Sequence, residues 1–147
     1  KKDTKSALEK AFSFGEIVMV EKYINGRELT VPIIDDKSYP ILEVKPSHEV
    51  YDYKCKYTPG LCEYVCPADL DSSIEKILQK STEHLFRKFG CKIYARADYI
   101  LDKSGSVNFL EMNTLPGMTS TSLVPKSAFA NGLSFERLID KIILLSI

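Results

Sequence analysis

The stretch IYARADYILDKSGSVNFLEMN, residues 93–113, consists of two largely apolar segments joined by the polar segment DKSGS. This pattern predicts a β-hairpin, with a two-residue turn at Ser104 and Gly105. One face of the hairpin is apolar and is expected to pack on a helix over residues 72–89. That face comprises Ile93, Ala95, Ala97, Tyr99 and Leu101 of the first strand and Leu110 and Met112 of the second.

The opposite face of the predicted hairpin is polar. Side chains two residues apart in a strand share a face, so Arg96 and Asp98 project together, as do Glu111 and Asn113. The two-residue turn sets Asp98 across from Glu111 and Arg96 across from Asn113. A register shifted by one residue would move the polar side chains onto the apolar face. The sequence therefore predicts one patch that contains all four polar side chains.

Two carboxylates opposed across a strand pair repel one another unless a cation lies between them. Magnesium suits this patch because it takes hard oxygen ligands, usually one or two carboxylates with water and phosphates, and the amide oxygen of Asn113 adds one more. Arg96 beside the acids favours a site that also binds phosphate. The alternative is an exposed hairpin face whose acids are solvated, with Arg96 pairing one of them.

The rest of the chain predicts strands and helices around this hairpin. Apolar periodicity is clearest over residues 72–89, where we expect a helix with a capping box of Ser72 and Glu75 at its start and Gly90 after its end. The other expected elements are helices over 6–12 and 135–145, the latter starting from Ser134, strands over 17–20, 27–35, 38–46 and 61–66, a tight turn at Asn25 and Gly26, and a loop over 47–60. Helices and a mostly antiparallel sheet in one globular unit give an α+β fold.

Composition argues against several classes of function. The 20 basic and 20 acidic residues cancel, so no long-range field favours nucleic acid or an anionic membrane. No apolar run reaches the roughly 18 residues of a membrane span, and no signal peptide is evident, so we expect a cytoplasmic protein. The cysteines and histidines lack zinc-site spacing, which favours reduced thiols over structural zinc. These residues are Cys55, Cys62, Cys66, Cys91, His48 and His84.

Beyond these physical arguments, ARADYIL (95–101) followed by FLEMNTLPGMTSTSLVP (109–125) closely resembles the carboxy-terminal part of the D-alanine:D-alanine ligase family, which has the ATP-grasp fold. The resemblance covers nearly the whole chain and extends to EKYINGRELTV, YDYKCKYTPG, CPADL and GLSFERLI. It implies ATP-dependent ligation of two D-alanines to D-alanyl-D-alanine for peptidoglycan precursor synthesis. The carboxylate of one D-alanine is phosphorylated, and the amine of the second attacks the acyl phosphate.

The resemblance also implies roles for individual residues at the phosphates of ATP. Asp98, Glu111 and Asn113 match ligands of two magnesium ions, for which manganese can substitute. Arg96 matches the arginine that stabilises the transferred phosphoryl group and the tetrahedral intermediate. Lys56 matches a lysine that contacts phosphate. This set agrees with the patch derived from the hairpin.

Other matches concern the nucleoside and the second substrate. The adenine-binding hinge corresponds to Glu21, Lys22, Tyr23 and Ile24. Glu28 matches the acid that holds the ribose hydroxyls. Gly117 permits close approach of the backbone and can help form an oxyanion hole, while Ser122 and Leu123 match contacts to the carboxylate of the second D-alanine. Catalytic roles are thus implied for Arg96, Gly117, Ser122 and Tyr57.

Two tyrosines, Tyr51 and Tyr57, match the mobile loop that closes over the site in this family. Such a loop would exclude water that would otherwise hydrolyse the acyl phosphate. Tyr57 also favours the dipeptide ligase over the alternative of a related D-alanine:D-lactate-type ligase. Thr121 departs from the family, which usually has histidine there, and we expect this difference to affect loop packing or substrate contact.

The resemblance assigns residues 1–147 to the carboxy-terminal, ATP- and magnesium-binding domain. The amino-terminal substrate domain and the glycine-rich phosphate loop would precede Lys1, so we expect a fragment that is inactive alone and belongs to a homodimeric enzyme. A non-catalytic nucleotide-binding module is a further alternative. The joint retention of the polar patch and Lys56 argues against it, because a degenerate site has no physical need for opposed acids.

Overall fold

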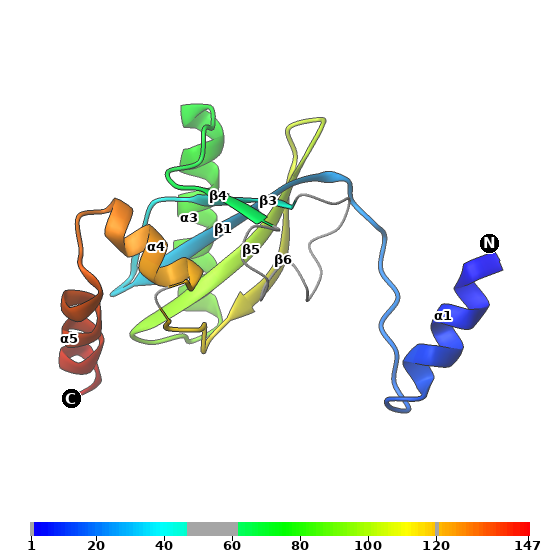
Figure 1. Ribbon diagram of the computed structural model, residues 1–147. Helices are drawn as coiled ribbons and strands as arrows, with labels where there is room; N and C mark the ends of the chain where they lie inside the picture. The colour runs from blue at the N-terminus through cyan, green and yellow to red at the C-terminus, as the bar shows by residue number, and fades with distance from the viewer. Residues whose placement is uncertain (1, 47–61, 120) are drawn as a thin grey trace.

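The computed structural model describes residues 2–46, 62–119 and 121–147, and within them six antiparallel strands form one sheet (Figure 1). The strand order is β4-β3-β1-β5-β6, and β2 pairs with the end of β1. The strands are β1 (Gly26–Ile34), β2 (Lys37–Ser38), β3 (Leu42–Pro46), β4 (Cys62–Val65), β5 (Tyr94–Asp102) and β6 (Val107–Asn113). The helices are α1 (Lys2–Phe12), α3 (Ser72–Lys88), α4 (Leu123–Ala130) and α5 (Phe135–Ser146). The predicted α+β class with an antiparallel sheet is confirmed.

Strand β1 lies at the centre of the sheet. It pairs with β5 along its whole length, from Gly26 opposite Asp102 to Ile34 opposite Tyr94. Its sequence, GRELTVPII, is rich in β-branched and aliphatic residues, and the last six positions are buried. Such a segment suits a strand that is covered on both faces.

Gly26 is needed where β1 begins. A Cβ at this position would meet the carbonyl oxygen of Leu101 and lie 2.6 Å from Cγ2 of Ile100. The predicted tight turn at Asn25 and Gly26 is therefore wrong. The glycine allows two strands to approach closely and does not reverse the chain.

Helix α3 covers one face of the sheet (Figure 1). Its Leu78 and Phe86 are buried against alternate residues of β1 and β5. These partners are Leu29, Val31, Ile33, Ala95, Ala97, Tyr99 and Leu101. The buried hydroxyl of Thr82 on α3 forms a hydrogen bond of 2.9 Å with the hydroxyl of Tyr99. The predicted packing of the apolar hairpin face on this helix is confirmed for the residues of β5 that belong to these clusters.

The ends of α3 differ in how well the sequence predicted them. The predicted capping box is wrong, because the N-cap is Asp71 and it makes no side-chain capping bond. Ser72 is the first helical residue, and the backbone N–H of Glu75 donates to the Asp71 carbonyl at 3.0 Å. The prediction for Gly90 is confirmed, since its φ of +65° is the left-handed conformation that favours glycine after a helix.

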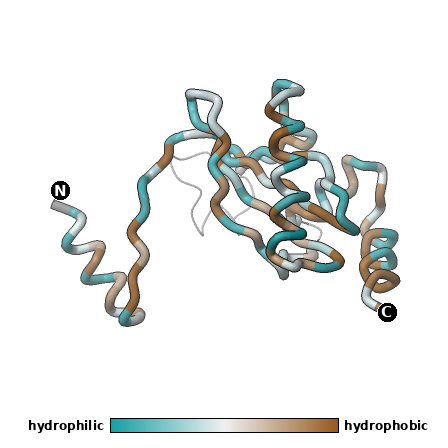
Figure 2. The backbone as a smooth tube through the Cα atoms, turned by 180° about the vertical axis from the view of Figure 1, so that it is seen from behind, coloured by the Kyte–Doolittle hydropathy of each residue, from teal (hydrophilic) through white to brown (hydrophobic). Residues whose placement is uncertain are grey.

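Helices α4 and α5 pack at the end of the sheet, with α4 on the side opposite α3 (Figures 1 and 2). Val124 and Ala128 of α4 and Leu138 of α5 are buried in one cluster with Ile34 of β1. The predicted start of the last helix is confirmed, because Ser134 is its N-cap and its Oγ accepts a backbone hydrogen bond from three residues further on.

The chain before the sheet projects away from it as an N-terminal arm (residues 2–25), made of α1 and an extended segment (Figure 1). The predicted helix is confirmed and is longer than expected. The predicted buried strand over 17–20 is wrong, because Ile17, Met19 and Val20 are 95%, 80% and 75% exposed and no described strand pairs with them. Figure 2 shows this apolar run along the arm. A strand needs a neighbour to satisfy its backbone, and the described residues supply none here.

The β5–β6 hairpin has the predicted register at the polar patch. Asp98 lies opposite Glu111, and Arg96 lies opposite Asn113. Strand β5 begins one residue later than predicted, because Ile93 has a φ of +66° and so lies outside the extended region.

The turn of this hairpin is longer than predicted. The backbone N–H of Asp102 donates to the carbonyl of Ser106 at 3.0 Å, which leaves three residues in the loop. A β-bulge compensates for the extra residue. Tyr99 pairs with Phe109, so Leu110 has no opposite residue. The predicted two-residue turn is thus wrong. The strand register that was inferred from it is nevertheless confirmed at the polar patch.

The remaining expectations are met with shifted bounds. The predicted strand over 27–35 ends at Ile34, because Asp35 and Asp36 both have a φ of 58° and form a turn. The strand over 38–46 is divided between β2 and β3, and the strand over 61–66 is β4. The loop over 47–60 lies outside the described residues.

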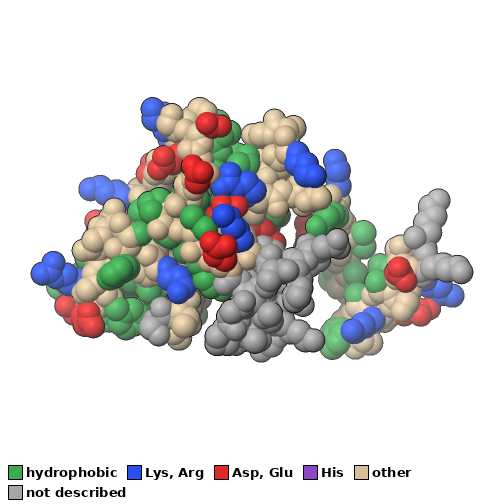
Figure 3. Space-filling view, turned by 45° about the horizontal axis from the view of Figure 1, so that its top comes forward, with side chains coloured by type: hydrophobic (Ala, Val, Ile, Leu, Met, Phe, Trp, Pro, Cys, Tyr) green, Lys and Arg blue, Asp and Glu red, His purple; other side chains and the backbone are tan. Residues whose placement is uncertain are grey.

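The surface of the described residues carries both signs of charge. Figure 3 shows lysine, arginine, aspartate and glutamate side chains intermixed over the face that it displays. Among the described residues, no helix is long and apolar enough to cross a membrane.

We expect Gly26→Ala to lower the free energy of unfolding by about 1–3 kcal/mol, because its Cβ would overlap the backbone of β5. Gly15→Ala is the matched control, since a Cβ there meets nothing within 4 Å, and its effect should stay within about 0.5 kcal/mol. Urea denaturation followed by circular dichroism measures both. Equal effects of the two substitutions would contradict the close strand contact.

Candidate functional site

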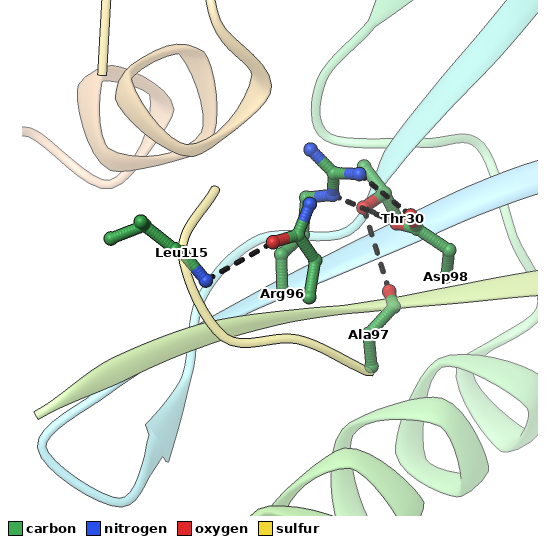
Figure 4. A network of polar contacts seen from close by, with 6 residues as sticks. Thr30, Arg96, Ala97, Asp98 and Leu115 are labelled. Carbon is green, nitrogen blue, oxygen red and sulfur yellow. Dashed lines mark hydrogen bonds and ion pairs between the residues drawn. The ribbon is translucent and has the colours of Figure 1, made fainter. Parts of the chain in front are cut away.

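Arg96 and Asp98 of β5 form a bidentate ion pair on the face of the sheet opposite α3 (Figure 4). The Nε of Arg96 donates to Oδ1 of Asp98 at 2.9 Å, and Nη2 donates to Oδ2 at 2.7 Å. The hydroxyl of Thr30 on β1 also donates to Oδ1. The two charged side chains are only 14% and 20% exposed. Arg96 therefore does pair with an acid, as the alternative interpretation held, but the pair is mostly shielded from solvent.

The other two patch residues lie on β6. Glu111 is opposite Asp98, and its side chain is exposed. Asn113 is opposite Arg96, and its Oδ1 accepts a hydrogen bond of 3.1 Å from the backbone N–H of Leu115. This bond holds the Asn113 amide at the start of the loop that follows β6.

The donor atoms of this patch fit a magnesium ion. The carboxylates of Asp98 and Glu111 and the amide oxygen of Asn113 are hard oxygen donors, and magnesium is commonly bound by one or two carboxylates with water and phosphate in the other positions. Within the described ranges, no group of three or more His, Cys, Asp or Glu residues could hold a metal. The patch offers two carboxylates and one amide, so a magnesium ion there would take its other ligands from water or from a phosphate-bearing ligand.

Two neighbouring pockets adjoin the patch. The larger has a volume of about 570 Å³, and its lining includes Glu21, Lys22, Tyr23 and Ile24 of the N-terminal arm with Ile100, Phe109 and Leu110 of the hairpin. The smaller has a volume of about 360 Å³, and its lining includes Thr30, Arg96, Asp98, Glu111 and Leu123. Glu28 and Leu110 line both pockets. Cavities of this size with a few convergent polar groups are typical of small-molecule sites.

Arg27 and Glu43 form a second bidentate ion pair, and both line the larger pocket. Nε of Arg27 donates to Oε1 at 2.8 Å, and Nη2 donates at 2.7 Å both to Oε2 and to the carbonyl of Asp69. Glu43 is 5% exposed, and its hydrogen bonds raise the pKa of the Arg27 guanidinium above its usual value. The pair joins β1, β3 and the segment before α3 at the pocket.

The loop after β6 brings Gly117 close to Ser122. A Cβ on Gly117 would lie 3.1 Å from the Ser122 hydroxyl, so glycine permits this approach. Ser122 is the N-cap of α4, but its hydroxyl bonds to the backbone N–H and the hydroxyl of Thr119. Thr121 joins this hydroxyl cluster through a bond of 3.1 Å to Thr119. The side chain of Leu123 is mostly buried and has no polar atom, so a polar contact of Leu123 with a ligand can come only from its backbone.

Leu110 is a site residue, and its predicted place on the apolar face of the hairpin is wrong. The strand period places it with the residues that pack on α3, but the bulge turns it toward both pockets. Phe109 takes the position facing α3, with its ring 5.6 Å from that of Tyr99 in an edge-to-face contact. No glycine or proline marks this bulge in the sequence.

Neither Thr30 nor the ion pair of Arg27 with Glu43 was predicted from the sequence. The only available signal for the pair was a carboxylate within the otherwise apolar segment ILEV. Three residues predicted for the site, Tyr51, Lys56 and Tyr57, lie outside the described residues.

Comparison with known proteins agrees with this arrangement. The family model described as the D-ala D-ala ligase C-terminus matches residues 1–144. The D-alanine–D-alanine ligase of Methylacidiphilum infernorum is 42% identical over 145 residues, which cover 99% of this chain and 48% of that protein. The D-alanine–D-alanine ligase of Syntrophotalea carbinolica is 44% identical over 138 residues, which cover 94% and 45%.

Solved structures give the same result. The D-alanine–D-alanine ligase from Bacillus anthracis, complexed with ATP, has a TM-score of 0.85 and 36% identity, covering 99% of this chain and 48% of that one. The VanG D-Ala:D-Ser ligase from Enterococcus faecalis has a TM-score of 0.83 and 33% identity, covering 100% and 44%. The chain thus spans about half the length of these relatives.

The sheet, its opposed acids and its likeness to these structures make this an ATP-grasp domain. Within that class, the chain belongs to the D-alanine–D-alanine ligase family and corresponds to its carboxy-terminal part.

We expect Arg27→Met to lower the free energy of unfolding by about 1–2 kcal/mol, because the carboxylate of Glu43 then stays 5% exposed without its charged donors. The value is at the low end because Arg27 itself is 40% exposed. Lys5→Met is the control, since the Lys5–Glu9 pair is solvent-exposed and spans 3.8 Å. Urea unfolding compares the two variants, and an equally small loss in both would show that the Arg27–Glu43 pair contributes little.

Proposed function

We propose that the protein to which this chain belongs is a D-alanine:D-alanine ligase, which forms D-alanyl-D-alanine for peptidoglycan precursors at the expense of ATP. In this proposal residues 1–147 form the domain that binds ATP and magnesium. The observation that supports it most is the adjacency of the polar patch to two pockets that together are large enough for a nucleotide.

The larger pocket binds the adenosine part of ATP in this proposal. Residues 21–24 offer backbone groups to the adenine edge, and Leu110 and Ile100 offer apolar surface to its ring. Glu28 lines both pockets, so its carboxylate is suited to accept hydrogen bonds from the two ribose hydroxyls between the base and the phosphates.

The smaller pocket binds the phosphates. Asp98 and Glu111, which line this pocket, hold magnesium together with Asn113, which lies opposite Arg96. We expect two ions, which manganese can replace. The bound cations supply positive charge that reduces repulsion between the phosphates and an incoming carboxylate. Arg96 stabilises the phosphoryl group as it is transferred, because its guanidinium donates several hydrogen bonds in a fixed plane.

The proposed reaction has two steps. A carboxylate oxygen of the first D-alanine attacks the γ-phosphorus, the bond from that phosphorus to the bridging oxygen breaks, and ADP leaves. The amine of the second D-alanine then attacks the acyl carbon and loses a proton, and the bond from carbon to the phosphate oxygen breaks. The backbone N–H of Gly117 helps stabilise the developing oxyanion, and the Ser122 hydroxyl and Leu123 N–H bind the carboxylate of the second D-alanine.

The roles of Lys56 at the phosphates and of Tyr51 and Tyr57 in closing the site remain predictions. So do the homodimeric state and the cytoplasmic location. The residue roles and the homodimeric state follow from the family resemblance, whereas the cytoplasmic location is the expectation drawn above from the apolar pattern of the sequence.

A second candidate is a ligase with another second substrate. The likeness to a D-Ala:D-Ser ligase favours D-serine as one alternative, and D-lactate is another. These enzymes would share the phosphoryl-transfer step and differ at the loop that holds Ser122, where Thr121 stands in place of the usual histidine.

The decisive experiment measures ADP release by the full-length protein with magnesium and ATP. We expect release with D-alanine alone and none with L-alanine. Release that requires D-serine or D-lactate beside D-alanine would assign the alternative second substrate. Nucleotide binding without turnover on any of these substrates would favour a non-catalytic module.

We expect Glu111→Gln to lower turnover by roughly 100-fold, because it removes one of the opposed charges that hold magnesium. Glu75→Gln on α3 is the matched control, since Glu75 lies on the exposed side of that helix, and it should retain turnover. Steady-state ADP release in the full-length protein compares them. Near-normal turnover of Glu111→Gln would refute its assignment as a metal ligand.

We expect Arg96→Ala to lower kcat by roughly 100-fold and to weaken nucleotide binding much less, because its proposed contact forms mainly in the transition state. Calorimetric binding of a non-hydrolysable ATP analogue, set beside kcat, separates the two effects. Equal losses in affinity and turnover would mean that Arg96 serves ground-state binding.

A further inference from the structure

From the contacts of Asp98 we infer that Thr30 is a positioning residue, which fixes the Asp98 carboxylate so that Oδ2 is the oxygen presented to magnesium. This inference rests on the proposed function, since it concerns the metal that the patch is proposed to bind. No role for Thr30 follows from the sequence, where it is one β-branched residue in a strand of such residues.

Thr30 is held rigidly beside Asp98. It lies directly opposite Asp98 in the pairing of β1 with β5, and it is 2% exposed. Its hydroxyl donates to Oδ1 of Asp98 (Figure 4), while the carbonyl of Ala97 is farther away, at 3.5 Å. A hydroxyl has one proton to donate, so the nearer carboxylate oxygen receives it.

The two oxygens of Asp98 are used unequally. Oδ1 receives two donors, the Thr30 hydroxyl and Nε of Arg96, whereas Oδ2 receives Nη2 of Arg96. A carboxylate oxygen accepts about two hydrogen bonds. Among the contacts described here, Oδ1 is therefore saturated, and Oδ2 retains capacity for a cation in the smaller pocket, which Asp98 lines.

Thr30 also matters because Arg96 has a second task. In the proposed reaction the Arg96 guanidinium also donates to the transferred phosphoryl group, so its hydrogen bonds are divided between that group and Asp98. The Thr30 hydroxyl has no such second task, and its buried, β-branched side chain is held in one rotamer on the central strand. Thr30 thus keeps Oδ1 occupied and the carboxylate plane fixed while Arg96 acts elsewhere, as residues behind metal ligands commonly do.

The test uses three variants of the full-length protein. Thr30→Val removes the hydroxyl with little change in shape, and Thr30→Ser restores a hydroxyl. Thr82→Val is the matched control, because Thr82 is also fully buried and hydrogen-bonded by its hydroxyl, but to Tyr99 on the α3 side of the sheet. The readout is the Kd of Mn²⁺ in the presence of ADP, measured by electron paramagnetic resonance, with the thermal midpoint recorded for each variant.

We expect Thr30→Val to raise the Kd of Mn²⁺ by about tenfold, Thr30→Ser to recover most of the affinity, and Thr82→Val to leave it unchanged despite a similar loss of thermal stability. Equal Mn²⁺ affinity in Thr30→Val and Thr82→Val would overturn the inference while leaving the proposed function intact. Absence of nucleotide-dependent Mn²⁺ binding in the unmodified protein would overturn both. If Thr30→Val does not fold, Thr30→Ser alone decides. A Kd of Mn²⁺ raised less than threefold in Thr30→Ser supports the inference, and a Kd raised tenfold opposes it.

Discussion

The antiparallel pairing of β1 with β5 is the constraint on which the rest of this domain depends. It extends over nine residues, and its register sets Thr30 beside Asp98 while Leu29, Val31 and Ile33 face α3. Because side chains alternate between the two faces, a shift of one residue would bury the acids against α3 and expose the core. The same ladder of hydrogen bonds therefore determines both the packing of the core and the composition of the site.

The polar patch could be predicted from the sequence because only one strand register keeps its side chains off the apolar face. This alternation of polar and apolar side chains fixes the register at Asp98 and Glu111 but does not determine the length of the turn between them. The chain uses a longer turn and a bulge, and the two changes cancel at the patch. Leu110 was assigned to the wrong face because of this bulge. A bulge adds one residue to a strand, and the alternation of polar and apolar residues does not show where that residue lies.

Other parts of the site depend on how separate strands align, which a single sequence does not contain. The pair of Arg27 with Glu43 and the bond of Thr30 to Asp98 each join residues from different strands of the sheet. The predicted strand over 17–20 in the N-terminal arm is wrong because pairing with a described strand is missing there. Its apolar run has strand character, but the described residues offer it no neighbouring strand. Residues 21–24 were identified by family resemblance, and no periodicity pointed to them.

The larger pocket has walls of two kinds. Part of its lining belongs to the sheet, and part belongs to the extended segment of the N-terminal arm, which forms no ladder of hydrogen bonds with the strands that the structure describes. A molecule bound there contacts both parts and so fixes their relative orientation. The binding free energy of that molecule would then be the favourable free energy of its contacts, reduced by the free-energy cost of ordering the arm. Affinity at this pocket thus depends on how far the arm is already held in place before the ligand arrives, as well as on the residues that touch the ligand.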